Sequence, residues 1–359
     1  MTAGPLSDTE RIAWLRLART PNVGPVAFEH LLQRCGSAAA AVAALPDLAR
    51  RHVDISTKAD AERELEAGER LGAQLICAAE PGFPPLLAAI DPPPPLIWTL
   101  GRAELLPRPA VAIVGARVAS AGGQRFARGL AAELGQAGRL IVSGLARGID
   151  GAAHEGSLAT GTVAVLGGGV GDIYPPEHAD LHARIADQGC VVSESPPDHR
   201  AQARDFPRRN RLISGLSLAV VVVEAELKSG SLITARLAAE QGREVLAVPG
   251  SPLDPRARGT NDLLRQGAAV CESAEDVLRA LEGLPGLRER KRRPWTGPAD
   301  PPPDGLRDQL EALLSPTAVT IDDLVRASGA PAPAVFAALV ELSLAGAAVF
   351  GPGGTVVRA

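Results

Sequence analysis

The chain has 359 residues, 46% of them hydrophobic, and its 37 Lys and Arg against 41 Asp and Glu give a net charge of −4. This length predicts two or three globular domains, and the composition excludes a disordered chain. The net negative charge excludes a uniformly basic coat for nucleic acid. Of the 37 basic residues only 3 are Lys, and because arginine binds phosphate through a forked guanidinium, the positions of the arginines matter more than their number.

The first 70 residues predict a helical domain. Helical patterns occupy residues 7–19, 25–35, 37–46 and 57–72, and a Pro/Gly turn at 20–25 separates the first two. The following segment, 81–95, is rich in proline. Since runs of proline fit neither a helix nor a central strand, this segment is expected to be an extended connector.

Residues 71–284 predict an α/β domain with an extended Rossmann-like, doubly wound parallel sheet. Short apolar runs, typical of strands buried on both faces, lie at 110–114, 139–142, 162–166, 190–193, 218–223 and 244–248. Helical patterns alternate with them at 121–137, 148–158, 177–188, 207–215 and 230–242. This alternation is characteristic of a parallel sheet covered by helices on both faces.

A basic, proline-rich linker is expected at 285–304, followed by a winged-helix domain at 305–359. The last domain shows three helical patterns and a glycine-containing hairpin, at 305–314, 319–328, 332–344 and 347–357. The helix that would enter a DNA groove, 332–344, contains no Lys or Arg. Because groove-reading helices need basic or amide side chains, we expect this domain to bind protein.

Several classes of protein are disfavoured by motifs that the sequence lacks. It shows no signal-peptide pattern, no run of 18 uncharged apolar residues and no C-x-x-C pair, which predicts a cytoplasmic protein with reduced thiols and no membrane partner. It shows no G-x-G-x-x-G fingerprint, Walker A loop or H-E-x-x-H motif, and its six histidines have no convincing metal spacing. We therefore expect no cofactor, no metal and no enzymatic activity.

Two turns at the carboxyl ends of predicted strands carry groups that bind anions. Parallel sheets bind ligands at this edge, where backbone N–H groups and helix N-termini favour negative charge. The first turn offers Gly115, Arg117 and Ser120, and the second offers Ser143, Gly144, Arg147 and Gly148. Two such turns favour a polyanion site. Asp150 and His154, four residues apart on the next helix, are either half of a catalytic pair or a helix cap with a hydrogen-bonded histidine.

The segment 200–211 holds five arginines and one aspartate. It includes Phe206, Arg209, Asn210 and Arg211, a combination of arginine and aromatic residues that suits single-stranded nucleic acid. After the strand at 218–223 come Ser229, Gly230, Ser231 and Thr234, which can bind phosphate or can simply cap the next helix.

These segments together resemble the DNA-processing protein A (DprA/Smf) family. The resemblance rests on six colinear motifs between residues 80 and 270: Ile113–Arg117, Ser143–Asp150 with His154, Tyr174-Pro175, Phe206–Gly215, Ser229–Thr234, and Glu240–Arg243 with Val248–Ser251. It implies a dimeric protein that binds single-stranded DNA (ssDNA) without sequence preference and loads the recombinase RecA onto it during natural transformation. It also implies that the turns and arginines above form the phosphate pocket.

The N-terminal turn fits the resemblance, whereas the residues after Tyr174-Pro175 depart from the family pattern. The turn at 22–27 resembles a helix-hairpin-helix or SAM-like element, for which we expect contact with protein rather than with DNA. Many family members carry a lysine soon after the Tyr-Pro, where this chain has Pro176-Glu177-His178, so Arg200 or Arg204 is the candidate replacement.

The alternative is a nucleotide phosphoribohydrolase of the LOG type, which also uses glycine-rich turns at this sheet edge. The hallmark of that family is P-G-G-x-G-T-x-x-E. The corresponding segment here, 228–235, does not match it.

Overall fold

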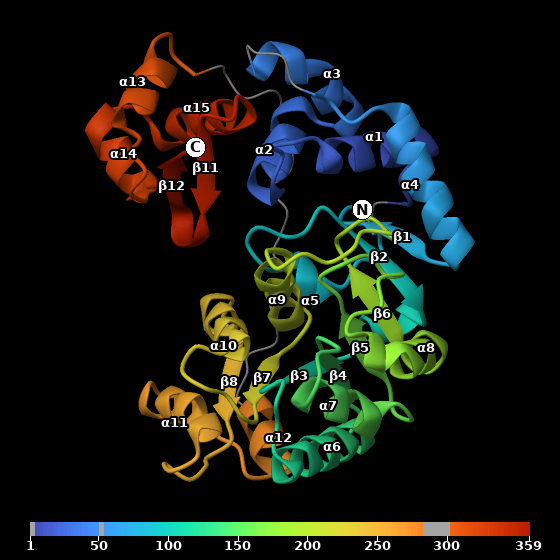
Figure 1. Cartoon of the computed structure of the whole chain (residues 1–359). Coiled ribbons are helices and arrows are strands. Elements are labelled where there is room, and N and C mark those ends of the chain that lie inside the picture. The colour runs from blue at the N-terminus through green and yellow to red at the C-terminus, as the bar shows by residue number, and fades with distance from the viewer. Residues whose placement is uncertain (1–3, 50–53, 283–301) are drawn as a thin grey trace. The chain divides into compact units, whose positions relative to one another are not determined.

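The computed structural model describes residues 4–49, 54–282 and 302–359. The chain forms two compact units: one combines Met1–Arg63 with Lys291–Ala359, and the other is Glu64–Arg290 (Figure 1). Most of the linker expected at 285–304 lies outside the described residues, and the boundaries 1–70, 71–284 and 305–359 stay predictions.

A nine-stranded sheet forms the centre of the second unit. Its order is β1-β2-β6-β5-β4-β3-β7-β8-β9; the pairs from β6 to β9 are parallel, whereas β1 and β2 join antiparallel at one end. The strands are β1 (Gln74–Cys77), β2 (Leu96–Gly101), β3 (Ala110–Val114), β4 (Leu140–Ser143), β5 (Thr162–Val165), β6 (Cys190–Ser193), β7 (Ala219–Val222), β8 (Glu244–Ala247) and β9 (Ala269–Val270). The six strands expected from the sequence are confirmed; β1, β2 and β9 were not expected.

The helices expected between the strands are also confirmed. They are α6 (Ala121–Gln136), α7 (Ile149–Ser157), α8 (Ala179–Gln188), α9 (Asp205–Gly215) and α10 (Gly230–Glu240), and further helical elements are α4 (Lys58–Leu71), α5 (Pro85–Ala88), η1 (Ala103–Leu105), η2 (Pro176–His178), η3 (Pro255–Ala257), α11 (Arg258–Arg265) and α12 (Ala274–Glu282). The expectation that 81–95 is entirely extended was wrong, because it contains α5. Pro84 and Pro85 lie at the N-cap and first position of this turn, where a missing N–H has little cost.

Alternate strand residues pack into two separate cores. Ala112 and Val114 of β3 belong to the core beneath α5, α9 and α10, whereas Val111 and Ile113 belong to the core beneath α6, α7 and α12. Every residue of β3 to β7 is buried. This double coverage explains why the strands are continuous apolar runs in the sequence.

The connections of β3 create the edge where a ligand is expected. From β3 the chain builds β4, β5 and β6 on one side, and it later returns to place β7 on the other side of β3. In open α/β sheets, ligands bind outside the carboxyl ends of the strands at such a reversal. The turns after β3 and β4 and the loop after β5 all leave the sheet at this edge.

The first unit contains helices from both ends of the chain: α1 (Asp8–Arg19), α2 (Pro25–Cys35), α3 (Ala38–Ala49), α13 (Leu306–Leu313), α14 (Ile321–Ser328) and α15 (Ala332–Leu344). The winged helix has a small sheet of β10 (Val319–Thr320), β11 (Ala348–Gly351) and β12 (Thr355–Arg358), with η4 (Pro352–Gly354) between the last two.

Helix α15, the expected groove-reading helix, is covered on two sides. Residues 337–344 are all buried. One side, including Leu339, packs into the core of the winged helix. On the other side, Glu341 forms an ion pair of 3.0 Å with Arg34 of α2, and the ring of Phe336 lies 5.4 Å from that of His30. In this arrangement α15 contacts protein within its own chain.

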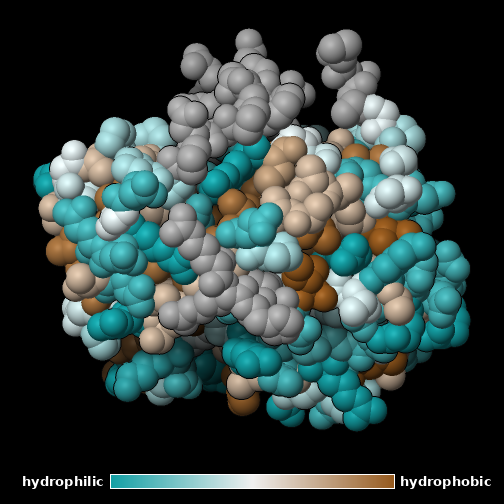
Figure 2. Space-filling view, turned by 90° about the horizontal axis from the view of Figure 1, so that it is seen from above, coloured by the Kyte–Doolittle hydropathy of each residue, from teal (hydrophilic) through white to brown (hydrophobic). Residues whose placement is uncertain are grey.

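Hydrophilic residues cover most of the molecular face in Figure 2, with hydrophobic ones interspersed among them. In the described part of the chain, no single helix is long and apolar enough to cross a membrane. Helices α14 and α15 have the necessary length and apolar composition only when they are taken together, and they are bent by 112° relative to each other.

Candidate nucleic-acid interface

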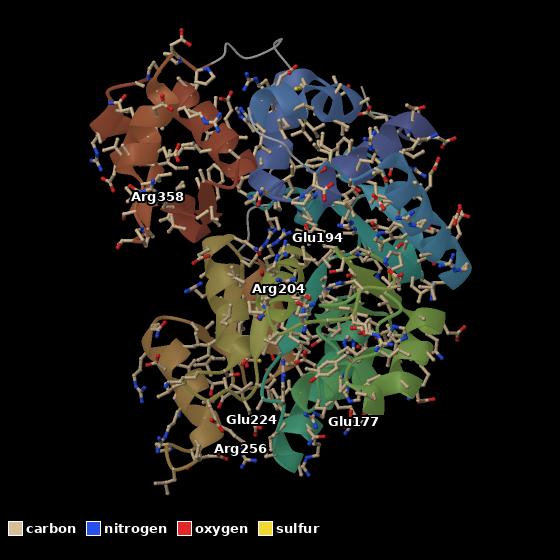
Figure 3. All side chains as sticks on the ribbon, turned by 45° about the horizontal axis from the view of Figure 1, so that its top comes forward. Glu177, Glu194, Arg204, Glu224, Arg256 and Arg358 are labelled. Atoms are coloured by element: carbon tan, nitrogen blue, oxygen red, sulfur yellow. The ribbon has the colours of Figure 1, made fainter. Side chains whose placement is uncertain are left out.

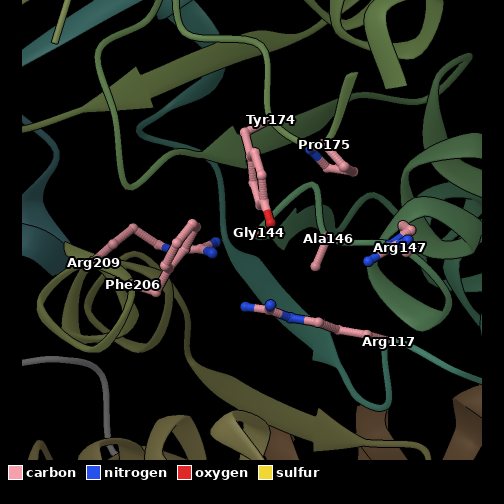
Figure 4. Close-up of a pocket in the computed structure, with 8 residues that line it drawn as sticks. All are labelled: Arg117, Gly144, Ala146, Arg147, Tyr174, Pro175, Phe206 and Arg209. Carbon is pink, nitrogen blue, oxygen red and sulfur yellow. The ribbon is translucent and has the colours of Figure 1, made fainter. Parts of the chain in front are cut away.

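A pocket with an open volume of about 300 Å³ lies at the predicted sheet edge (Figure 4). Four segments line it: the turns after β3 and β4, the loop after β5, and the start of α9. The lining residues are Arg117, Gly144, Ala146, Arg147, Tyr174, Pro175, Phe206 and Arg209. The structure therefore brings together five of the residues that the sequence predicted: Arg117, Gly144, Arg147, Phe206 and Arg209.

Two aromatic rings and one guanidinium, all planar groups, lie close together in this pocket. The rings of Tyr174 and Phe206 are 5.5 Å apart, and the Arg117 guanidinium carbon lies 5.4 Å from the centre of the Phe206 ring. Figure 4 shows the Tyr174 hydroxyl and the end of Arg117 pointing toward the middle of the lining residues. Tyr174 is 47% exposed, so a planar ligand can reach it from solvent and stack.

Asp150 and His154 hold the turn after β4 in shape. The Gly144 N–H donates to an Asp150 carboxylate oxygen at 3.0 Å, and the Leu145 N–H donates to His154 Nε2 at 3.3 Å. Leu145 has the left-handed φ of 56°, which is rare for a bulky residue and needs such support. His154 Nδ1 also contacts Thr162 Oγ1 at 2.7 Å. These contacts favour the structural interpretation of the pair over the catalytic one.

Arg209 lines the pocket from a buried position. The residue is only 7% exposed, and Nη1 donates to the Val165 carbonyl at 2.8 Å. Burial lowers the pKa of Arg209 to about 10, against the favourable charge of Asp150. Burial also raises the pKa of Asp150, which Arg209 opposes. A Cβ on Gly144 would overlap the Arg209 guanidinium, so only glycine fits there.

The other predicted binding residues do not line this pocket: Gly115, Ser120, Ser143, Gly148, Asn210, Arg211, Ser229, Gly230, Ser231 and Thr234. Several have partners within the protein. Ser120 donates to Glu224 through its N–H at 2.9 Å and its hydroxyl at 2.5 Å. Arg211 pairs with Glu194 at 2.5 Å. The role of these residues in binding stays a prediction.

The remaining groups serve the local fold. Ser143 Oγ donates to the Ile113 carbonyl at 2.6 Å, and the Asn210 amide donates to the Gly230 carbonyl at 3.2 Å. Ser229 caps α10 by accepting from the Ser231 N–H, while Thr234 is buried. The structure shows the helix cap, and phosphate binding by residues 229–234 stays a prediction.

Tyr174, Pro175 and Ala146 line the pocket but were not among the predicted binding residues. Tyr174 is the only tyrosine of the chain and stands in a loop at the ligand edge. A single tyrosine in the loop that follows a predicted strand was the signal in the sequence that could have identified it. Within the described residues, no group of three or more His, Cys, Asp or Glu side chains could hold a metal ion.

The burial of His154 predicts acid-sensitive stability. Burial lowers its pKa from 6.5 to about 3, so between these values the unfolded chain binds a proton that the folded chain does not. The free energy of unfolding should therefore fall as the pH drops below 6.5, with this residue contributing about 3 kcal/mol of the loss by pH 4. Urea titrations at pH 7 and pH 4 measure this. His154→Gln should show a smaller loss than the parent protein, and an equal loss in both would contradict the assignment.

Comparisons with known proteins agree with this fold. Residues 74–282 match the sequence model of DNA recombination-mediator protein A. Residues 8–67 match the DprA-like N-terminal HHH domain, and 294–354 match the DprA winged helix domain. Protein Smf of Escherichia coli is 40% identical over 292 residues, which cover 80% of this chain and 78% of that protein.

Two solved structures are similar as well. DNA processing protein A from Streptococcus pneumoniae has a TM-score of 0.61 and 29% identity, over 77% of this chain and 98% of that one. DNA processing protein A from Helicobacter pylori, whose structure concerns its ssDNA-binding mode, has a TM-score of 0.54 and 30% identity, over 58% of this chain and 95% of that one. With one family model covering more than half of its length, the chain belongs to the DNA recombination-mediator protein A (DprA/Smf) family.

Proposed function

We propose that this protein binds ssDNA without sequence preference and loads RecA onto it during natural transformation. The observation that carries the proposal is the pocket, where three arginines and two aromatic rings line one volume. Phosphates can bind to Arg117 and Arg147 while a base stacks on Tyr174 or Phe206. Stacking tolerates any base, because every base has a π-face.

The relatives support this proposal. The similar protein from Helicobacter pylori is described by its mode of binding ssDNA, and the family model describes a recombination mediator. RecA loading is the step by which such a protein would mediate recombination. We propose that it acts in the cytoplasm, and that it binds DNA without catalysis, since Asp150 and His154 are engaged within the turn.

We further propose a homodimer formed through the Rossmann-like domain. Strand β9 lies at one end of the sheet, and Val270 in it is 49% exposed. An exposed edge strand with an apolar side chain is well suited to pair with a second copy.

A salt titration with matched DNAs tests the central proposal. The protein should bind a single strand of mixed sequence more tightly than the duplex made from it, and scrambling the sequence should leave the affinity within about twofold. The logarithm of the affinity should fall linearly with the logarithm of the salt concentration. Preference for the duplex, or a strong dependence on sequence, would contradict the proposal.

A further inference from the structure

A carboxylate lies beside the mouth of the pocket. Glu177 Oε1 is 3.7 Å from Nη1 of Arg147, one of the three arginines that line the pocket. The two side chains are 62% and 58% exposed. Glu177 comes two residues after Pro175, which also lines the pocket, and Figure 3 shows it in the same unit.

The protein backbone fixes the two partners of this pair near each other. Glu177 belongs to η2, and the next residue, His178, contacts the Leu145 carbonyl through Nδ1 at 3.0 Å. The His178 ring also packs closely on Gly151, where a Cβ would lie 2.8 Å from Cε1. The segment with Glu177 is thereby attached to the turn that carries Arg147, so the carboxylate is held within reach of this arginine.

We propose that Glu177 competes with DNA phosphate for Arg147 and so limits the affinity of the pocket. This inference rests on the proposed function, in which the pocket binds ssDNA. Carboxylate and phosphate oxygens accept from the same guanidinium N–H groups, so a phosphate that binds Arg147 must displace Glu177. An exposed ion pair of this kind is weak, and ssDNA can therefore displace it at a modest cost in affinity.

The competition has a specific consequence for salt dependence. Binding of DNA to unpaired basic side chains depends on salt, because counterions leave the DNA when its phosphates are neutralised. Arg147 is already paired with Glu177. When a phosphate replaces Glu177, the released carboxylate attracts a cation from solution, which offsets the counterion that the DNA loses. The Arg147 contact should therefore add less to the salt dependence than an unpaired arginine would.

Two other predicted binding residues are paired with carboxylates in a similar way. Glu194 binds Arg211 and Glu224 binds Ser120, and Figure 3 labels both glutamates. The Arg211–Glu194 pair is less accessible, with side chains only 20% and 21% exposed. Glu177 is therefore more easily displaced by a ligand than Glu194.

The test compares Glu177→Gln with the matched control Glu155→Gln. Glu155 pairs with Arg128 outside the pocket, and these side chains are 44% and 48% exposed. Both substitutions raise the net charge by one. With an oligothymidylate probe, Glu177→Gln should bind two- to fivefold more tightly than the parent protein at low salt. The slope of log affinity against log salt should steepen by up to about 0.7, whereas Glu155→Gln should change neither quantity appreciably.

Each outcome distinguishes the inference from the proposed function. If the parent protein does not bind the probe, the proposed function fails. If the parent binds but Glu177→Gln has the same affinity and slope, or if Glu155→Gln improves binding equally, the competition by Glu177 is overturned. In an Arg147→Ala background Glu177→Gln should lose its effect, because the competition requires the arginine. Equal thermal midpoints for Glu177→Gln and the parent verify that folding is unchanged.

Discussion

Replacing Arg209 with alanine is expected to lower the free energy of unfolding by about 3 kcal/mol. Removing one partner of a buried pair is costly because it leaves the other charge without compensation. Here the substitution leaves the buried Asp150 without the guanidinium and removes the hydrogen bond to the Val165 carbonyl. Urea unfolding followed by circular dichroism measures the loss.

The neighbouring arginine provides the control. Arg208 stands next to Arg209 on α9 but is exposed, so Arg208→Ala should change stability by less than about 0.5 kcal/mol. If both variants have the same urea midpoint of unfolding as the parent protein, the structural role assigned to Arg209 is wrong. Arg209→Ala should also weaken ssDNA binding, since the turn around Gly144 would lose its support.

Removing the Phe206 ring is expected to lower ssDNA affinity about tenfold, since stacking of one base on an aromatic ring contributes about 1–3 kcal/mol. Phe206→Leu is the preferred substitution, because it keeps apolar volume beside Gly167, which the ring approaches closely. The affinity should fall while the slope against salt stays unchanged, because no phosphate contact is lost. Fluorescence anisotropy at several salt concentrations measures both quantities.

Arg117→Ala should behave in the opposite way with respect to salt. Loss of one phosphate contact should reduce the affinity and flatten the salt slope by about 0.7, the contribution of one contact to a single strand. Arg125→Ala, at an exposed position of α6 outside the pocket, is the matched control. Unchanged affinity in both the Phe206 and the Arg117 variants would exclude this pocket as the binding site.

The sheet could be predicted because its strands are buried on both faces. Six strands from β3 to β8 are short apolar runs, and their burial in two cores produces that pattern directly. Strand β2 directly follows the proline-rich segment 81–95, which predicts an extended connector, so the strand was not recognised. Strand β9 has only two residues, both exposed. Strand β9, at one edge of the sheet, therefore lacks the buried apolar pattern on which the prediction depended, whereas β2 lies inside the sheet between β1 and β6 and is mostly buried.

The site was predicted in part, and Arg209 shows why. The sequence indicated a cluster of arginines, but their number alone does not say which side of α9 each one occupies. Leu212, Ile213 and Leu216 follow Arg209 at three, four and seven residues, so all four share one face of the helix. That face is the buried one. Helical periodicity could therefore have separated Arg209 from the exposed Arg204 and Arg208. The partners Glu194 and Glu224 are distant in sequence, and only the fold brings them near.

The contact between α2 and α15 has a consequence for synthesis on the ribosome. Arg34 and Glu341 are 307 positions apart in the chain, so the side of α2 that α15 covers stays uncovered until α15 has left the ribosome. The residues of the nine-stranded sheet emerge earlier and can pair among themselves, since domains generally fold as units during translation. Helix α2 is thus made before the strands of the sheet, but the side of it that contacts α15 is completed only after them.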